Sequence, residues 1–334
     1  MKRNNLGLAS CAAAVLLGWA GLASAQQTVV LYTSNEATLN KLIAAGFEKE
    51  TGIAVNVISA GSGVVIKRLQ SEKDRPQGDL VWGISRSLLQ TNAEYLDAYA
   101  SAHKSVIPAE FRDAQDRWIG TNLHLLVVLQ NTKSLPEAQG PKTWEDLTES
   151  RFKGNIAFTD PANSGSAYSN VTLLVDMWGG GNAGWGKVEK LFANTRMLNR
   201  SSLVFQGVGN GEYPLGVSLE YAGYLWANNG APVKVIYPAD GTIAQMEGIG
   251  VIKGGPNTAG ARKFVDYVNR KDVREMILTQ TFRRPARQDL DLPNLPGKMP
   301  RLADIKLVKY DEAGWTAKRG ETLERIKETI QKTR

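Results

Sequence analysis

Cysteine and histidine are scarce in this chain of 334 residues. Cys11 is its only cysteine and lies in an N-terminal segment that we expect to be removed, while His103 and His124 are its only histidines. A mature chain without cysteine has no disulfide, no thiolate metal site and no cysteine nucleophile. The composition therefore excludes disulfide-stapled scaffolds and cysteine-dependent enzymes.

Long apolar runs and blocks of like charge are also missing after residue 25. Residues 1–25 have the pattern of a cleavable signal peptide, with basic Lys2 and Arg3, an apolar stretch at 6–22 and Ala-Ser-Ala at 23–25. Removing this segment lowers the formal net charge from +7 to +5, and no run of five like charges is left. We therefore expect a soluble monomer in the periplasm, with no membrane span and no nucleic-acid partner.

Common enzyme motifs are absent as well. The sequence contains no Gly-x-Ser-x-Gly elbow, no His-Glu-x-x-His and no Asp-rich metal loop. A pair of carboxylates of the glycosidase type stays possible among the 33 acidic residues. The loops expected to face a ligand carry Ser, Thr, Gly and Asn, which hold a ligand by hydrogen bonds without activating it. We therefore expect a binding protein rather than an enzyme, with no cofactor.

Strand and helix patterns alternate over residues 29–83. Strands are expected at 29–32, 54–58 and 79–83, with helices over about 36–50 and 64–72 between them. Thr33 and Glu36 have the spacing of a capping box at the start of the first helix. This βαβαβ order predicts a parallel sheet with helices on its faces, and ligands of such sheets sit beyond the carboxyl ends of the strands.

A third strand-loop-helix unit follows at residues 156–175. The apolar run 156–158 leads into a loop that contains Ser164, Gly165 and Ser166, and then into an apolar helix face at 171–175. Such a unit directs unpaired backbone N–H groups and the positive end of a helix dipole at one spot, which suits an anion. The alternative is that these serines only cap the helix. Three units of this kind in one chain favour an anion site.

Two further apolar strands are expected to connect two lobes. Residues 123–129 are interpreted as the first crossing between lobes and residues 248–253 as the crossing back. Lobe 1 is then predicted to contain residues 26–124 and 246–281, and lobe 2 residues 125–245 and 282–334. A helix is expected to begin at Glu220, and a last helix is expected over residues 311–332.

Several segments, taken in order, resemble a known family. They are residues 30–34 (Val-Leu-Tyr-Thr-Ser), 78–83 (Gly-Asp-Leu-Val-Trp-Gly), 144–147 (Trp-Glu-Asp-Leu), 152–154 (Phe-Lys-Gly), 160–168 (Asp-Pro-Ala-Asn-Ser-Gly-Ser-Ala-Tyr), 230–233 (Gly-Ala-Pro-Val) and 237–238 (Tyr-Pro). This ordered set covers the mature chain and resembles the family 1 extracellular solute-binding proteins of ABC importers. The resemblance implies an α/β type II periplasmic binding fold, with a mostly parallel sheet flanked by helices in each lobe and crossover strands as a hinge. It also implies a small solute enclosed between the lobes and an inner-membrane ABC permease as partner.

Two branches of that family differ in their ligand. One branch binds ferric iron through a pair of adjacent tyrosines at the position of Tyr221. This sequence has Ala222 next to it, and Tyr224 lies one helical turn further on, so Tyr221 and Tyr224 are the alternative iron ligands. The other branch binds phosphorylated or phosphonate solutes and is more similar around Ser164 to Ser166 and around residues 237–238. We favour an anionic phosphorylated or phosphonate solute, with ferric iron as the alternative.

The resemblance to the phosphate branch gives each candidate residue a role. The anionic group would be held by Thr33, Ser34, Ser62, Gly63, Ser164, Gly165 and Ser166. Glu220 would accept hydrogen bonds from the rest of the ligand, and Tyr221 would stack on it or bond to it. The alternative for this last pair is a helix-start acid, favoured there by the helix dipole, and a core aromatic residue.

Overall fold

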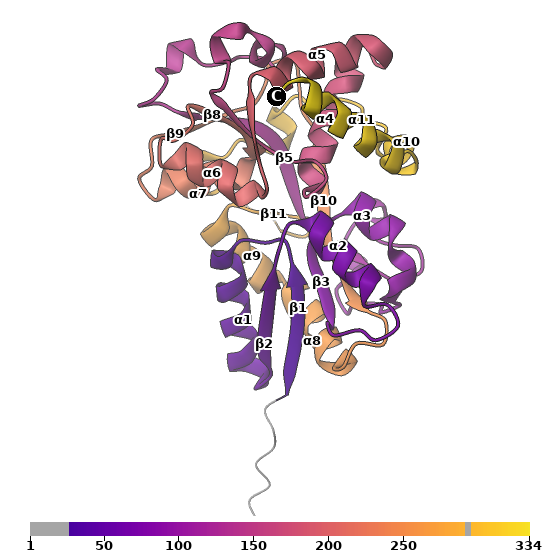
Figure 1. Ribbon diagram of the computed structural model, residues 1–334. Coiled ribbons are helices and arrows are strands. Elements are labelled where there is room, and N and C mark those ends of the chain that lie inside the picture. Colours follow the sequence, from indigo (N-terminus) through magenta and orange to yellow (C-terminus); the bar gives the residue numbers. More distant parts are fainter. Residues whose placement is uncertain (1–26, 291–294) are drawn as a thin grey trace, which may run out of the picture.

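The computed structural model describes residues 27–290 and 295–334, so the expected signal peptide lies outside the described residues. Figure 1 shows two lobes joined by two long strands, β5 (Ile119–Asn131) and β10 (Ala244–Ile252). These strands pair antiparallel from Leu125 with Ala244 to Ile119 with Ile249. They are the predicted crossing strands. No helix in the described part of the chain is both long and apolar enough to cross a membrane.

Lobe 1 is built on the predicted βαβαβ unit. Its elements are β1 (Thr28–Thr33), α1 (Ala37–Thr51), β2 (Ala54–Ser59), α2 (Ser62–Ser71), β3 (Leu80–Ser85) and α3 (Arg86–Thr91), with β4 (Leu96–Asp97), α8 (Thr258–Asn269), α9 (Lys271–Thr281) and β11 (Arg284–Pro285) added from later in the chain. β1 pairs parallel with both β2 and β3, and β10 pairs antiparallel with β3.

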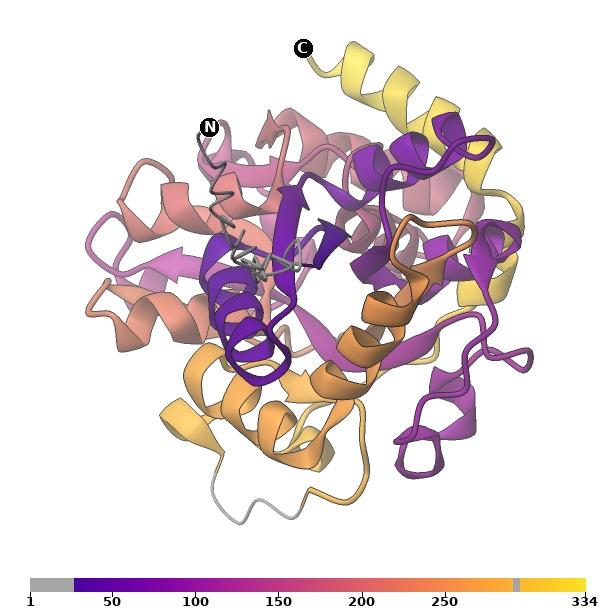
Figure 2. The ribbon, with the colours of Figure 1, turned by 90° about the horizontal axis from the view of Figure 1, so that it is seen from below.

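Side chains of the lobe 1 strands alternate between the two faces of the sheet, as a period of two requires. Leu31 packs in the cluster formed with α1 and α8, whereas its neighbour Tyr32 packs in the cluster formed with α2 and α3. Figure 2 shows α8 and α9 beside α1. The sheet is therefore covered on both faces, which explains why its strands are apolar almost throughout.

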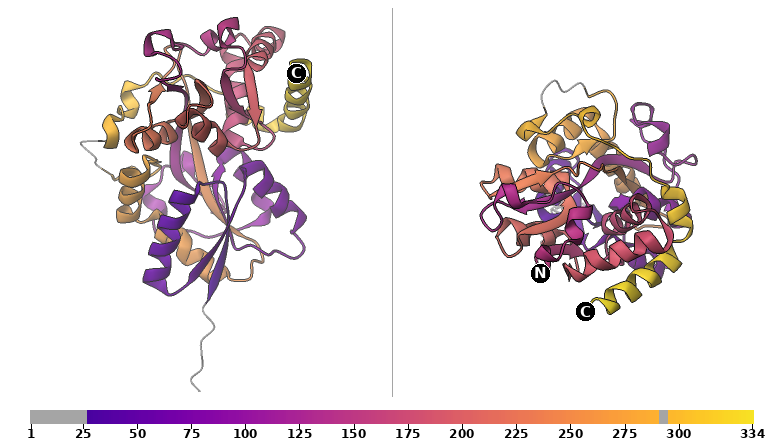
Figure 3. Two further views of the ribbon diagram at one scale, coloured as in Figure 1. Left: turned by 60° about the vertical axis from the view of Figure 1, so that its left-hand side comes forward. Right: turned by 90° about the horizontal axis from the view of Figure 1, so that it is seen from above.

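Lobe 2 has a second sheet of parallel strands. Its elements are β6 (Ile156–Thr159), α4 (Gly165–Met177), α5 (Gly181–Ala193), β7 (Thr195–Leu198), α6 (Ser201–Gly209), β8 (Leu215–Leu219), α7 (Glu220–Asn228), β9 (Val233–Ile236), α10 (Glu312–Ala317) and α11 (Arg319–Lys332). β6 pairs parallel with β7 and β8, while β8 and β9 pair antiparallel with β5. Helix α11 packs against α5 on the outside of the lobe (Figure 3).

Short 3-10 helices fill the connections. They are η1 (Ala93–Tyr95), η2 (Lys104–Val106), η3 (Ala109–Phe111), η4 (Glu137–Gln139), η5 (Glu145–Thr148), η6 (Ser150–Phe152), η7 (Pro296–Lys298) and η8 (Leu302–Asp304).

Each lobe reverses its strand order at one point. In lobe 1 the chain runs from β1 to β2 on one side, and then returns to β3 on the other side of β1. In lobe 2 it runs from β6 to β7, and then returns through α6 to β8 on the other side of β6. Ligands of open α/β sheets bind at such switch points, beyond the carboxyl ends of the strands. These two points position the site described below.

Two local predictions are corrected by the structure, and two elements of lobe 2 were missed. The capping box at Thr33 and Glu36 does not form: Thr33 Oγ1 accepts a hydrogen bond from the backbone N of Asn35 (3.1 Å), and the Glu36 carboxylate pairs with Arg283 instead. The predicted last helix is interrupted at Lys318 and forms α10 and α11. Strand β7 and helix α6 were not predicted.

The chain also leaves lobe 1 later than residue 281. β11 pairs with Asn122 and Leu123 in the lobe 1 half of β5. Further on, the backbone N of Gln288 donates to the carbonyl oxygen of Val106 (3.0 Å). Residues 282–288 therefore pack with lobe 1, although the predicted boundary assigned them to lobe 2.

Candidate functional site

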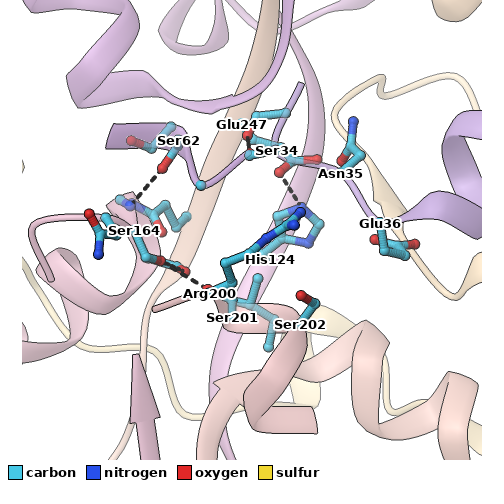
Figure 4. Close-up of a pocket in the computed structure, with 18 of the residues that line it drawn as sticks. Ser34, Asn35, Glu36, Ser62, His124, Ser164, Arg200, Ser201, Ser202 and Glu247 are labelled. Carbon is cyan, nitrogen blue, oxygen red and sulfur yellow. Dashed lines mark hydrogen bonds and ion pairs between the residues drawn. The ribbon is translucent and has the colours of Figure 1, made fainter. Parts of the chain in front are cut away.

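A pocket of about 70 Å³ lies between the lobes at the two switch points. One water requires roughly 10–15 Å³ of such space, so the pocket has room for several waters or a small solute. Serine is the most frequent residue in its lining, which includes Ser34, Ser62, Ser85, Ser164, Ser166, Ser201 and Ser202. Figure 4 shows serines from both lobes around one space, together with His124, Arg200 and Glu247.

Lobe 1 supplies its serines from the ends of strands and the starts of helices. Ser34 directly follows β1 and donates a hydrogen bond from Oγ to the carbonyl oxygen of Gly83. Ser62 is the first residue of α2, and Ser85 ends β3 immediately before α3. Strand ends and helix starts coincide here because each connection in this sheet is short.

Lobe 2 supplies a connected group of hydroxyls at two helix N-termini. Ser164 is the N-cap of α4, where its Oγ accepts from the backbone N of Ala167 (3.3 Å). The same Oγ lies 3.0 Å from Ser166 Oγ and 3.0 Å from Ser201 Oγ, and Ser201 is the first residue of α6. The positive ends of two helix dipoles and three hydroxyls therefore meet at one place, an arrangement that favours an anion.

The two lobes touch along one edge of the pocket. The backbone N of Gly165 in lobe 2 donates to Ser62 Oγ in lobe 1 (2.8 Å), and the backbone N of Gly63 donates to the carbonyl oxygen of Asn163 (3.3 Å). A Cβ added at Gly63 would be 3.2 Å from the carbonyl carbon of Ala162 and closer still to its oxygen. Only a residue without a side chain permits this approach, so the structure is closed here.

Arg283 is the central cation beside the pocket, with 1% of its surface exposed. It pairs with Glu36 through Nη2 and with Glu247 through Nη1 (3.1 Å). Its guanidinium carbon lies 3.6 Å from the ring centroid of Tyr221. Burial by itself would lower the pKa of Arg283, but the nearby Glu36, Tyr221 and Glu247 raise it overall. Arg283 is therefore charged and already compensated by two carboxylates.

Glu247 anchors the other side of this network. Its Oε2 lies 2.8 Å from His124 Nε2, and its Oε1 accepts from Asn122 Nδ2 (2.8 Å). Burial would raise the pKa of Glu247, but the charges of His124 and Arg283 outweigh it and lower the pKa to about 2. Arg274 extends the network from α9, because its Nη1 donates to Asn122 Oδ1 (2.8 Å). Ion pairs and hydrogen bonds of these side chains thus connect hinge strands β5 and β10 to each other, to Arg283 just before β11 and to α9.

The structure brings six of the predicted site residues together in the pocket lining. They are Ser34, Ser62, Ser164, Gly165, Ser166 and Tyr221. Their contact with a ligand stays a prediction. Thr33 and Gly63 do not line this pocket: Thr33 is fully buried, and Gly63 is used in the contact between the lobes.

Glu220 requires a correction. It is not among the residues that line the pocket, and its carboxylate accepts hydrogen bonds from Arg284 Nε (2.7 Å) and Arg284 Nη2 (2.8 Å). Tyr237 donates a further hydrogen bond to Glu220 from its hydroxyl. The predicted role of Glu220 toward the ligand therefore conflicts with the pairs that the residue makes, and the helix-start alternative fits better.

Sequence reasoning missed several residues of the pocket. Arg200, Ser201 and Ser202 form the start of α6, and the helix-start signal of two consecutive serines before an apolar run was present in the sequence. Glu36, Glu247 and Arg283 had no such signal, because they meet only through the tertiary fold. His124 lies in hinge strand β5 and also lines the pocket.

The two alternative iron ligands do not converge. Tyr221 lines the pocket and donates to Glu36 Oε2 (3.3 Å), and burial raises its pKa. Tyr224 does not line the pocket; it stacks on Phe282 with the ring centroids 6.1 Å apart, and its hydroxyl lies 3.3 Å from that of Tyr237. Among the described residues, no group of three or more His, Cys, Asp or Glu side chains is placed to hold a metal ion.

Comparison with known proteins places the chain among binding proteins. Residues 84–313 match the model of a family described as bacterial extracellular solute-binding protein. An uncharacterized protein of Haemophilus influenzae is 27% identical over 332 residues, which is 93% of each chain. A putative 2-aminoethylphosphonate-binding periplasmic protein of Salmonella typhimurium is 24% identical over 73% of each chain. An Fe(3+)-binding periplasmic protein of Serratia marcescens is 24% identical, covering 84% of this chain and 85% of its own.

Solved structures confirm the predicted fold. The periplasmic binding protein AfuA from Actinobacillus pleuropneumoniae, with exogenous fructose-6-phosphate bound, superposes with a TM-score of 0.83 at 23% identity, covering 92% of this chain and 99% of its own. Iron-bound HitA from Pseudomonas aeruginosa gives a TM-score of 0.77 at 21% identity, covering 91% of this chain and 99% of its own. At such identities the likeness shows the type II periplasmic binding fold and does not distinguish between ligands.

Proposed function

Because this chain belongs to the bacterial extracellular solute-binding protein family, we propose that it is the periplasmic binding component of an ABC importer. Its ligand in this proposal is a small phosphorylated or phosphonate solute, enclosed between the lobes and delivered to an inner-membrane permease. The protein acts as a monomer and enters the periplasm by means of a cleavable signal peptide.

The observation that carries this proposal is the meeting of α4, α6 and α2 N-termini with serine hydroxyls around one pocket. A phosphate or phosphonate group offers several acceptor oxygens to N–H and O–H donors from different directions. The names of two similar proteins support this class, since one is described as binding 2-aminoethylphosphonate and the other contains fructose-6-phosphate.

Ferric iron is the less favoured ligand. An iron site needs several hard oxygen ligands that converge on one point, and of the two candidate tyrosines Tyr221 lines the pocket. A second tyrosine is not at hand, because Tyr224 lies outside the pocket and stacks on Phe282. The similarity to iron-binding proteins therefore supports the shared fold and not a shared metal site.

We also propose that the bound solute is not chemically converted. A serine nucleophile needs an adjacent base that can accept its proton. The one histidine at the pocket, His124, directs Nε2 at Glu247 and Arg283, while Ser164 Oγ interacts with the hydroxyls of Ser166 and Ser201. This arrangement supports hydrogen bonding to an anion and provides no activated nucleophile.

A ligand panel tests the proposal. The mature chain would be incubated with glycerol 3-phosphate, fructose 6-phosphate, 2-aminoethylphosphonate, inorganic phosphate and ferric citrate, and thermal unfolding and visible absorption recorded. A ligand at a hundredfold excess over its Kd stabilises a protein by about 2.7 kcal/mol, so a true ligand raises the unfolding temperature clearly. We expect this rise with a phosphate ester or a phosphonate and no colour with iron. A visible band that disappears in Tyr221→Phe would contradict the proposal.

A further inference from the structure

A small recess in lobe 2 lies next to the pocket. It lies between β6 and β8, at the lobe 2 switch point, and has a volume of about 10 Å³. Ser166, Ser201 and Leu219 line both the recess and the main pocket. The recess therefore adjoins the main pocket at the serines that begin α4 and α6.

Two buried polar side chains line this recess without a partner. Asn170, on α4, is 1% exposed, and neither its Nδ2 nor its Oδ1 has a hydrogen-bond partner in the described part of the chain. Ser218, on β8, is 8% exposed, and its Oγ likewise has no partner among those residues. Each such atom costs about 1–3 kcal/mol when it is left unsatisfied. Two elements that direct unpaired groups at the same space indicate a binding position.

We propose that this recess is the subsite for one hydroxyl group of the ligand. The inference rests on the proposed function, because it places the anionic group of the same ligand at the serines in front. A space of about 10 Å³ accepts a single oxygen-sized group. Asn170 offers both a donor and an acceptor, which matches the donor and the acceptor of a hydroxyl.

The charge around the recess excludes an ammonium group. No carboxylate is among the residues that line it, and the positive ends of the α4 and α6 dipoles are directed toward it. Apolar walls from Leu126 and Phe158 suit the carbon that carries the hydroxyl. The group in this recess is therefore a hydroxyl and not an ammonium, and a hydroxylated phosphate ester, such as a short polyol phosphate or a sugar phosphate, is the ligand that fits it.

Binding titrations of the full mature chain test this subsite. Glycerol 3-phosphate and fructose 6-phosphate carry free hydroxyls, whereas methyl phosphate and 2-aminoethylphosphonate do not. The wild type should bind at least one hydroxylated probe at least tenfold more tightly than the other two. Asn170→Leu should weaken the binding of that probe tenfold or more and change the affinity for methyl phosphate by less than twofold. Ser218→Ala, a smaller change, should show the same selectivity with a several-fold loss, and Asn228→Leu, at an exposed position of α7, is the control.

The possible outcomes are distinct. If Asn170→Leu lost equal affinity for methyl phosphate and for the hydroxylated probe, Asn170 would only support the serines. If both variants kept the wild-type affinities, the recess would hold no ligand group. Either result overturns the subsite. Tighter binding of 2-aminoethylphosphonate by the wild type overturns it as well. If no phosphate or phosphonate binds the wild type, the proposed function itself fails and the subsite with it. The subsite is supported if the unliganded variants unfold at or above the wild-type temperature and lose affinity selectively for the hydroxylated probe.

Discussion

Closure of the lobes depends on the missing side chain of Gly63. In the closed structure a methyl group at this position would be 3.2 Å from the carbonyl carbon of Ala162, 3.3 Å from Cα of Asn163, and closer still to the Ala162 oxygen. All three atoms are backbone atoms, so a rotamer change cannot remove the clash. The lobes would have to separate by roughly 1 Å here to restore ordinary contact distances.

That separation has a calculable effect on affinity. It breaks the hydrogen bond from Gly63 N to Asn163 O and the one from Gly165 N to Ser62 Oγ. Each contributes about 0.5–1.5 kcal/mol net, so the closed state of Gly63→Ala loses roughly 1–3 kcal/mol. This corresponds to binding about 5-fold to 150-fold weaker. Since alanine is a better helix former than glycine and Gly63 lies in α2, the substitution should not destabilise the helix itself.

Calorimetric titration and small-angle scattering measure both consequences. We expect the wild type to contract when its ligand is added, and Gly63→Ala to bind more weakly and to contract less. Gly186→Ala is the matched control, because it also adds a methyl group within a helix, and nothing lies within 4 Å of the new atom. Wild-type affinity together with wild-type contraction in Gly63→Ala would refute this account of closure.

Two further predictions concern the serines and the buried charges. Ser166→Ala and Ser34→Ala should each weaken ligand binding about tenfold in calorimetry, since a hydrogen bond to a charged group contributes about 1.5–3 kcal/mol. Tyr221→Phe should weaken binding less. Ser71→Ala, at the exposed end of α2, is the control, and equal affinities in all four variants would contradict the predicted site. Glu247 has its pKa lowered from 4.5 to about 2 in the folded state, so it contributes stability that is fully present above pH 4.5 and is lost as the pH falls toward about 2. Thermal unfolding across that range should therefore be less dependent on pH in Glu247→Gln, and parallel curves for variant and wild type would show that the ion pairs do not act in this way.

Most of the fold could be predicted because its signals are local. Leu39, Ile43 and Phe47 recur at helical spacing, and all three are buried against the lobe 1 sheet. Strand β7 was missed for an equally local reason. Thr195–Leu198 is the last strand of the lobe 2 sheet and is only partly buried, so it lacks the apolar run that identified the central strands. With β7 overlooked, the start of α6 had no strand before it and was overlooked too.

Residues of the candidate site could likewise be predicted only where the signal is local. Ser62, Ser164 and Ser166 could be found from the sequence, because a serine before an apolar helix is a helix-start signal wherever the helix lies. The Arg283 network could not, since its carboxylates come from residues 36 and 247 and are brought together only by the hinge strands and β11. Glu220 was misjudged for the converse reason: its position at a helix start is visible in the sequence, but its partner Arg284 is 64 residues away.

In the proposed function, the division of the hydroxyls between the lobes allows a tightly held anion to be released. A free buried arginine would keep its attraction for the anion in the open state as well as the closed one, but Arg283 is compensated by Glu36 and Glu247. In the proposed site the donors are divided between the lobes, with Ser34 and Ser62 on lobe 1 and Ser164, Ser166 and the exposed Arg200 on lobe 2. Opening therefore leaves each lobe with only part of the donor set, in contact with water. A permease that separates the lobes would weaken binding without having to compete for a single strong ion pair.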